Sequence, residues 1–450
     1  MGKGLVVACL FFILAVSFFA AGEEYSYAGP NQEVRWEQEV SVPSYPPQNS
    51  GLGVLSGAVA TSDGGFALVG WINGGTGRYA DIVLVKTDAN GSQQWTRIYE
   101  DPNESMAFSV AQTTDGGYIM SGTTSSTPND LNSYELFLLK VDQYGAEEWN
   151  KTIPGVGGSP GGQIQQAPDS GYVTVGAGPL TVIKTFANGS LQWSRAYPTG
   201  GSSESATALQ ETSGGGCIVL AEADYQFTGG YGRGAYVLKV DGVGNMQWNR
   251  TFVSGETYID DVLRSVQETA DGGYILAGVS NSSEMVYSGR AWIVKLYSNG
   301  STQWSSTYDE SGLSSANLVR QTFDGGYIAA ITSLSYLGDR VCLWKTYANG
   351  TTTWLKLLTA TSYIRLLQQT SDGDYVLVGS GSVGWTGDLI KVSGSPPIPV
   401  QETVSTLYLV SLAFLGATIA TILVLIARSI RRKRSVDAQL RTRTSFQVAR

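Results

Sequence analysis

The residue types that carry most enzyme chemistry are scarce in this chain of 450 residues. It has no histidine, which excludes Ser-His-Asp and Cys-His nucleophiles, histidine-bound zinc or copper, and the usual proton carrier near neutral pH. Cys9 lies in an apolar N-terminal stretch, so only Cys217 and Cys342 remain, too few for a thiolate metal site. We therefore predict no metal, no other cofactor and no enzymatic activity.

Aspartate recurs at the start of glycine-containing turns. Calcium requires several oxygen ligands from one loop, and each of these turns offers one carboxylate followed by small residues. We therefore interpret the aspartates as Asx turns that cap hairpins, with calcium ligation as the alternative. They are Asp63, Asp115, Asp169, Asp271, Asp324 and Asp372.

A lysine ends an apolar segment after every such turn. Side chains two positions apart share a strand face, so each lysine is expected to pair with the residue two positions later, as Lys86 with Asp88. A ring of ligand-binding lysines is the alternative. The lysines are Lys86, Lys140, Lys184, Lys239, Lys295, Lys345 and Lys391.

Paired carboxylates are the remaining route to catalysis on polysaccharides, and they must lie at a defined separation in a pocket. Glu222, Asp224 and the pair at 260–261 are candidates, but nothing in the sequence brings them together. We interpret them as solvated loop acids. The glycine-rich stretch at 229–232 has no following Gly-Lys-Ser/Thr and is interpreted as a loop rather than a phosphate site.

These residues belong to a repeated unit that is most regular from Leu263 to Trp304. The unit contains four short apolar segments, with Asp-Gly-Gly between the first two and Asn-Gly between the last two. Both sequences are typical of tight hairpins. Four antiparallel strands form one sheet that cannot bury both faces alone, so the copies must pack on one another.

Two markers count the copies. The turn occurs seven times, with Gly214 replacing aspartate in the fourth copy and Asp374 replacing the second glycine in the seventh. The last-strand tryptophan also occurs seven times, but its first instance, Trp36, precedes any turn. We therefore predict an all-β, seven-bladed β-propeller of four-stranded antiparallel blades. The N-terminal strand would close the last blade, with Trp36 beside the strand that ends at Lys391.

The combined pattern of Q/E-T-x-D-G-G-Y, an apolar strand ending in lysine, Asn-Gly and tryptophan resembles the DGGY-type repeats of secreted archaeal and bacterial proteins. The resemblance covers residues 32–393. It implies a propeller similar to the quinoprotein, WD40 and kelch architectures, and it implies no activity.

The two ends of the chain predict a membrane-anchored protein. Residues 1–22 are typical of a signal peptide, 31–393 form the predicted propeller, and 394–403 form a proline-bearing linker. Residues 404–427 carry no charge and are long enough for a transmembrane helix. The basic tail, 428–450, predicts a cytoplasmic C-terminus and an extracellular propeller in the cell membrane.

Eight Asn-X-Ser/Thr sequons make the chain a candidate glycoprotein. Four of them are also Asn-Gly hairpin tips, where asparagine suits the turn for structural reasons. They begin at Asn90, Asn103, Asn150, Asn188, Asn249, Asn281, Asn299 and Asn349.

Function is expected on the propeller face that carries the long loops, away from the short hairpin turns. We place Trp71 and Trp385 in loops of neighbouring first and seventh repeats, where they would form an aromatic patch for glycan stacking or would pack inward. The predicted function is binding or adhesion, to an extracellular glycan or a cell-envelope protein, and not to nucleic acid because the chain is acidic (net charge −9). The alternatives are a polysaccharide hydrolase or lyase, a degenerate quinoprotein-like dehydrogenase, and a structural component of the cell envelope.

Overall fold

The computed structural model describes twelve segments of the propeller region, together with residues 427, 428 and 431. The segments are 34–41, 53–73, 80–127, 133–158, 163–227, 230–252, 261–280, 289–308, 313–334, 340–358, 363–380 and 386–396. The predicted signal peptide and nearly all of the predicted transmembrane segment lie outside them. Among the described residues, no helix has the length and hydropathy needed to cross a membrane. The chain divides into two compact units, Met1–Ile398 and Pro399–Arg450, and the propeller belongs to the first.

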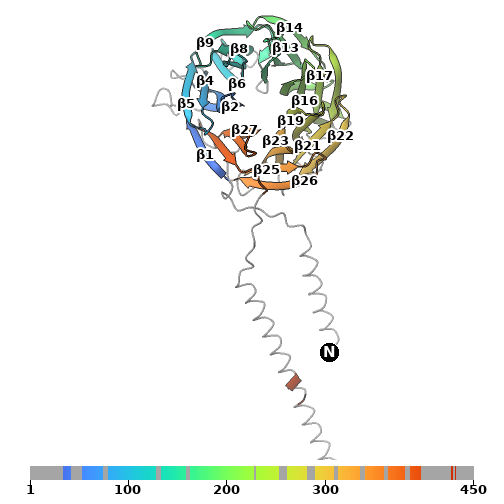
Figure 1. Ribbon diagram of the computed structural model, residues 1–450. Helices are drawn as coiled ribbons and strands as arrows, with labels where there is room; N and C mark the ends of the chain where they lie inside the picture. Colours follow the sequence, from blue (N-terminus) through green and yellow to red (C-terminus); the bar gives the residue numbers. More distant parts are fainter. Residues whose placement is uncertain are drawn as a thin grey trace, which may run out of the picture. The chain divides into compact units, whose positions relative to one another are not determined.

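Seven antiparallel sheets form blades around an open centre (Figure 1). Six follow one another in the chain, each running from an inner strand to an outer strand. The first three blades are β2 (Gly53–Ala60), β3 (Phe66–Asn73), β4 (Ala80–Thr87), β5 (Gln93–Tyr99); β6 (Glu104–Gln112), β7 (Tyr118–Ser125), β8 (Glu135–Val141), β9 (Glu147–Ile153); and β10 (Gly157–Gly158) with β11 (Ile164–Gln166), β12 (Tyr172–Ala177), β13 (Thr181–Thr185), β14 (Leu191–Ala196).

The remaining blades repeat this order, except that the seventh takes its outer strand from the start of the chain. They are β15 (Ser202–Glu211), β16 (Cys217–Phe227), β17 (Gly230–Val240), β18 (Met246–Phe252); β19 (Val262–Glu268), β20 (Tyr274–Ser280), β21 (Arg290–Leu296), β22 (Thr302–Tyr308); β23 (Leu313–Gln321), β24 (Tyr327–Leu334), β25 (Arg340–Thr346), β26 (Thr352–Leu358); and β27 (Tyr363–Gln369), β28 (Tyr375–Ser380), β29 (Thr386–Val392), β1 (Val34–Ser41).

The predicted closure is confirmed. β1 pairs with β29 and places Trp36 opposite Lys391, in the register that places Trp95 opposite Lys86 and Trp304 opposite Lys295. The seven-bladed, all-β architecture predicted from the repeats is therefore correct, whereas the predicted transmembrane helix falls outside the described residues.

The core lies between the blades. Second and third strands are covered on both faces by neighbouring blades, so their sequences are continuous apolar runs, and all eight residues of β4 are buried. Outer strands face solvent on one side and alternate instead, as β22 does. Cys217 in β16 and Cys342 in β25 are buried free thiols.

The turn network corrects one expectation. Six of the seven lysines that end the third strands pair with the turn aspartates of their own blades and not with the residue two positions later; Lys86 Nζ lies 2.7 Å from Asp63 Oδ2. Lys239 is the exception, because Gly214 replaces the aspartate of its blade, and it donates to Val240 O and Gly215 O instead. Lys86 lies opposite Ala67, four residues after the turn aspartate, so its ammonium reaches back over that turn. Asp88 instead accepts hydrogen bonds from the backbone N–H groups of Asn90 and Ser92. The predicted Asx turns are confirmed, because Gly65 N donates to Asp63 Oδ1 at 3.0 Å.

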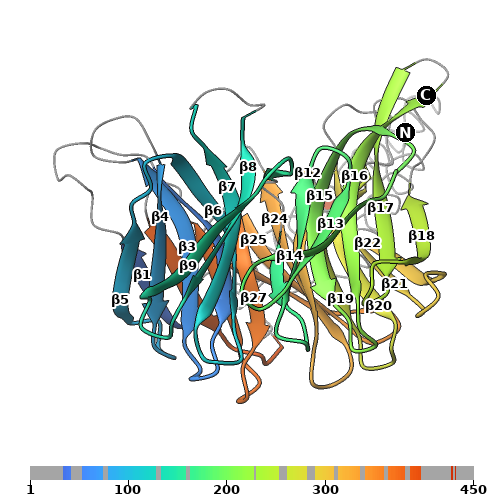
Figure 2. The same cartoon turned by 90° about the horizontal axis from the view of Figure 1, so that it is seen from above.

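Inner strands share one irregularity that matters for the site. In six blades the pairing of the first with the second strand skips one residue, leaving a β-bulge. The extra residues are Ser56, Phe108, Thr207, Arg264, Asn317 and Arg365. Figure 2 shows these inner strands running between the two faces of the ring, with tight turns along the lower face.

Candidate functional site

A cavity of about 390 Å³ occupies the centre of the ring. Its walls come mainly from the inner strands of the blades, and all six bulge residues line it, namely Ser56, Phe108, Thr207, Arg264, Asn317 and Arg365. A bulge adds one residue to a strand and redirects its side chain. The shared irregularity of the inner strands therefore turns one side chain from each of six blades toward the central cavity.

Two of these side chains are arginines from blades on either side of the sixth blade. Arg264 belongs to β19 and Arg365 to β27, with Asn317 of β23 between them. Both guanidinium-bearing residues remain accessible to solvent within the ring. Burial of Arg365 by the surrounding protein lowers its pKa from the ordinary value, while Tyr363 acts in the opposite direction. The two arginines therefore direct planar guanidinium groups, each with several hydrogen-bond donors, into the same cavity.

A third arginine lies toward the turn face. A smaller cavity of about 110 Å³ shares Gln163 and Leu318 with the larger one and is lined by Arg320. The Nη1 atom of Arg320 donates to Val319 O at 2.8 Å and to Ser265 Oγ at 3.3 Å. Burial lowers the pKa of Arg320 to about 10, so its side chain is still a cation at neutral pH.

The arginines lack carboxylate partners. Among the described residues, no ion pair involves Arg264, Arg320 or Arg365. Among the described residues, the one acid lining the larger cavity is Glu222, and its Oε1 lies 3.6 Å from Arg233 Nη1. The described part of the channel therefore carries excess positive charge inside a protein whose net charge is −9.

Glutamines near the turn face hold neighbouring blades in register. The Gln165 amide oxygen accepts from Glu211 N at 2.6 Å, and that of Gln267 accepts from Gln321 N at 2.6 Å. Gln210 accepts in the same way from Glu268 N at 2.5 Å. These bonds join consecutive inner strands and fix the lower end of the channel.

The sequence-based candidates do not form this site. Trp71 lies within β3, opposite Val54 and Ile82, and is half-buried. Its expected place in a loop is therefore wrong, because the second strand continues as far as Asn73. Trp385 lies outside the described residues, so the aromatic patch stays a prediction. Asp224 lies 3.3 Å from Arg233 Nε, which joins it to Glu222 through one arginine.

Six of the eight sequon asparagines are exposed, Asn103 is half-buried, and Asn281 lies outside the described residues. The exposed ones are Asn90, Asn150, Asn188, Asn249, Asn299 and Asn349. Among the described residues, no group of three or more Asp, Glu and Cys side chains could hold a metal ion.

The arginine site was missed because it has no motif of its own. Its signal is positional: Arg264 and Arg365 each stand seven residues before the turn aspartate of their repeats, and Asn317 stands seven before Asp324. An alignment of the repeats by their turns would have gathered these residues in one column. The sequence pattern does not reveal the bulge, and only the bulge shows that these aligned residues face the central cavity.

Comparisons with known proteins identify the architecture. No protein-family model matches the chain, and no curated protein does. Among solved structures it is similar to the Pan2 WD40 domain of Neurospora crassa, with 9% identity, a TM-score of 0.51, and coverage of 82% of this chain and 99% of that one. It is also similar to a PL25 ulvan lyase bound to -[GlcA(1-4)Rha3S]-, with 10% identity, a TM-score of 0.50, and coverage of 80% and 97%. At these identities the comparisons show the fold alone: the chain is a β-propeller.

Proposed function

We propose that this protein is a membrane-anchored, cell-surface binding module whose channel takes an anionic ligand, with acidic polysaccharide as the preferred class. One observation carries the proposal: three arginines enter the channel without carboxylate partners among the described residues. A cation surrounded by protein is stabilised when an anion replaces the water it has lost. Because the channel arginines have no carboxylate partner among the described residues, an anionic ligand can supply the missing interaction and gain binding free energy from it.

The shape of the site favours an extended ligand over a small ion. Arg264 and Arg365 line a cavity of about 390 Å³, and Arg320 lines a second one beyond Leu318. Charges that are distributed along the channel suit a chain with repeated carboxylate or sulfate groups, because each guanidinium can bind one group in bidentate geometry. The ulvan lyase of the same fold is a structure with a glucuronate- and sulfate-containing saccharide, which makes that class the first probe.

The chain leaves the last strand of the propeller on the face that carries the tight turns. Val392 ends β29 opposite Tyr375, next to the seventh turn, and Gly394 N donates to Asp374 Oδ1 at 2.9 Å. The linker therefore starts at the turn face. The bulge arginines lie farther from the turns than Arg320 does, so the larger cavity is nearer the opposite face.

The test compares two double variants that remove equal charge from the full-length chain. Arg264→Gln with Arg365→Gln removes the two cations of the larger cavity, whereas Arg97→Gln with Arg250→Gln removes exposed arginines of the outer strands. Affinity for ulvan oligosaccharides should fall by roughly tenfold or more in the channel variant, given about 1.5–3 kcal/mol for a hydrogen bond to a charged group. It should change little in the outer-strand variant.

Two outcomes would overturn the proposal. Equal losses in both double variants would show that binding depends on total charge and not on the channel. Equal binding of neutral glycans would show that the arginines do not select the ligand. The same incubations also measure turnover. If the wild type shortens the oligosaccharides and the channel variant does not, the site would be assigned to a lyase or hydrolase instead.

A further inference from the structure

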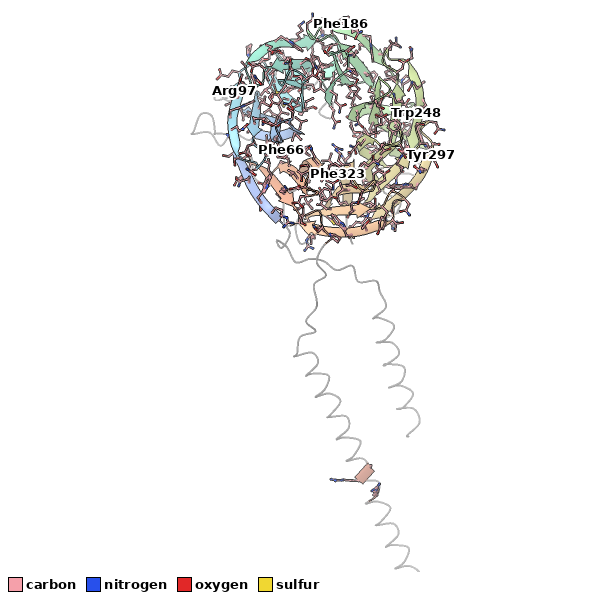
Figure 3. The ribbon with its side chains drawn as sticks, viewed as in Figure 1. Phe66, Arg97, Phe186, Trp248, Tyr297 and Phe323 are labelled. Carbon is pink, nitrogen blue, oxygen red and sulfur yellow. The ribbon has the colours of Figure 1, made fainter. Side chains whose placement is uncertain are left out.

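Neighbouring blades are joined by a repeated aromatic contact. A tryptophan of one outer strand packs against a tyrosine at the start of the second strand in the next blade, with ring centroids 5.7 to 6.1 Å apart. The pairs are Trp95–Tyr118, Trp149–Tyr172, Trp248–Tyr274, Trp304–Tyr327 and Trp354–Tyr375. At the closure, Trp36 and Phe66 belong to one apolar cluster. Phe66 and Trp248 are marked in Figure 3.

The junction between the third and fourth blades lacks this ring. Cys217 stands at the start of β16, where the other blades carry an aromatic residue, and Trp193 of β14 packs against the apolar cluster that contains Cys217. A cavity of about 170 Å³ lies there, lined by Trp193, Cys217, Val173, Lys184 and Glu211 among others. We call this cavity the junction pocket. The volume of the junction pocket is large enough for one aromatic ring, since an engineered cavity of about 150 Å³ in another protein binds benzene.

A hydrogen bond between the blades is also missing at this junction. At five others, the Gln or Glu three residues before the turn position accepts from a backbone N–H in the preceding blade, as Gln112 does from Ser62 at 2.7 Å and Glu268 from Ser213 at 2.7 Å. The equivalent acceptor here is Glu211, and the equivalent donor position is Pro168, which has no N–H. Among the described residues, no donor reaches the Glu211 carboxylate.

The Trp193 indole at this junction is also left without a hydrogen-bond partner among the described residues. Trp248 and Trp304 donate their indole N–H to carbonyls of the next blade at 3.0 Å, whereas Trp193 Nε1 is buried with no partner among the described residues. Three departures from the repeat, at Cys217, Pro168 and Trp193, therefore coincide at this junction.

The other junctions show what the pocket is shaped to hold. Tyr118 and Asp63 of the preceding blade line one cavity, and burial together with the Asp63 charge raises the pKa of Tyr118 to about 12. Burial and the Asp271 charge likewise raise the pKa of Tyr327 to about 12. The equivalent carboxylate here is Asp169, which lines the junction pocket and pairs with Lys184 at 2.5 Å.

We propose that the junction pocket is a binding site for a phenolic ring, which lies against Trp193 with its hydroxyl directed toward Asp169 and Glu211. The ligand occupies the space that a tyrosine of the chain itself fills at five other junctions. The site is separate from the arginine channel, and nothing in the channel argument depends on it.

The probe is p-cresol, the tyrosine side chain as a free molecule, titrated into the full-length chain in lipid nanodiscs by calorimetry. One equivalent should bind, and toluene and 4-methylcyclohexanol should bind more weakly because each lacks either the hydroxyl or the aromatic ring. Cys217→Tyr fills the pocket and should abolish binding. Tyr274→Cys opens the matching junction and should add a second equivalent. Undiminished binding in Cys217→Tyr, or no binding to the wild type, overturns the proposal.

A second measurement needs no variant. Cys217 and Cys342 are both buried thiols, but only Cys217 lines the junction pocket. p-Cresol should slow the alkylation of Cys217 by iodoacetamide and leave that of Cys342 unchanged, as measured by peptide mass spectrometry. Equal slowing at both thiols would mean that the ligand stabilises the whole fold from elsewhere, and it would contradict the assigned site.

Discussion

Trp36 lies opposite Lys391 across the closure of the ring, in the register shared by every tryptophan–lysine pair of the other blades. The first described strand and the last one therefore belong to the same sheet, although hundreds of residues separate them. The ring is closed by backbone pairing and side-chain packing, without a disulfide among the described residues. Its stability therefore depends on the packing of one terminal strand.

Replacing Trp36 tests the closure. Trp36 is half-buried against the cluster that contains Phe66 and Leu389, so Trp36→Ala should lower the free energy of unfolding by about 2 kcal/mol, below the range for fully buried aromatic residues. Tyr144→Ala, which removes a ring that is 64% exposed, is the control and should change little. Urea unfolding of both variants is the measurement. Equal, small effects would show that β1 contributes little to stability.

The lysine–aspartate pairs predict acid sensitivity. Burial disfavours ionised Asp271, but hydrogen bonds from Thr269, Lys295 and Gly273 outweigh it and lower its pKa from 3.8 to about 2. A carboxylate with a depressed pKa stabilises the fold above its unfolded-state pKa, and this contribution is lost as the pH falls from about 4 to about 2. Asp63, Asp324 and Asp372 behave alike.

The measurement is urea unfolding of wild type and Asp271→Asn at pH 5, 3 and 2. The variant should lose about 1 kcal/mol at pH 5, because the carboxylate is 54% exposed and screened by solvent. The difference between the two proteins should shrink toward pH 2. A difference that does not change with pH would assign the loss to turn geometry and not to the ion pair.

The repeat made the fold predictable and left the site unpredicted. Trp36 preceding the first turn was enough to infer the closure, because seven tryptophans and seven turns must form complete sheets. The partner of Lys86 could not be inferred from the spacing along its own strand, because Asp63 lies in the turn that precedes the neighbouring strand. Arg264 and Arg365 point into the channel because of a bulge, which local sequence does not signal. The long loops, where function was expected, fall partly outside the described residues.

Three of the exposed sequon turns carry an aromatic residue two positions before the asparagine. These are Phe186, Tyr297 and Tyr347, which are 51%, 51% and 59% exposed; Figure 3 shows Phe186 and Tyr297 at the outer edge of the ring. In the fourth such turn the position is Asp88. An exposed ring beside the linkage can pack against the C–H face of the first sugar. The glycans on Asn188, Asn299 and Asn349 should therefore stabilise the fold more than the glycan on Asn90.

This is measured on protein expressed in a host that N-glycosylates secreted proteins. Removal of Asn188 glycosylation by Ser190→Ala should lower the melting temperature in the wild-type background and lower it less in a Phe186→Ala background. Ser92→Ala, which removes the Asn90 sequon, should be insensitive to Phe186→Ala. Glycopeptide mass spectrometry supplies occupancy, and empty sites at all six exposed asparagines would contradict the assignment of the chain as a glycoprotein.

Glu211 predicts a pH effect of opposite sign. Burial raises its pKa from 4.5 to about 7, with Lys184 lowering it and Asp169 raising it further. The folded protein therefore holds a proton that the unfolded chain releases above its own pKa, so stability falls as the pH rises from about 4.5 to about 7. Glu211→Gln removes the ionisable group and should stabilise the protein at pH 8 by about 1–2 kcal/mol after allowance for solvent screening. At pH 4, where the carboxyl is neutral in the folded state, the substitution should have little effect.

Glu268→Gln is the matched control, because Glu268 occupies the same repeat position but accepts from Ser213 N. Its substitution weakens a bond between blades and should not stabilise the protein at either pH. Urea unfolding at pH 4 and pH 8 distinguishes the two, and a Glu211→Gln variant without a gain at pH 8 would show that the missing donor at Pro168 leaves no strain in the junction pocket.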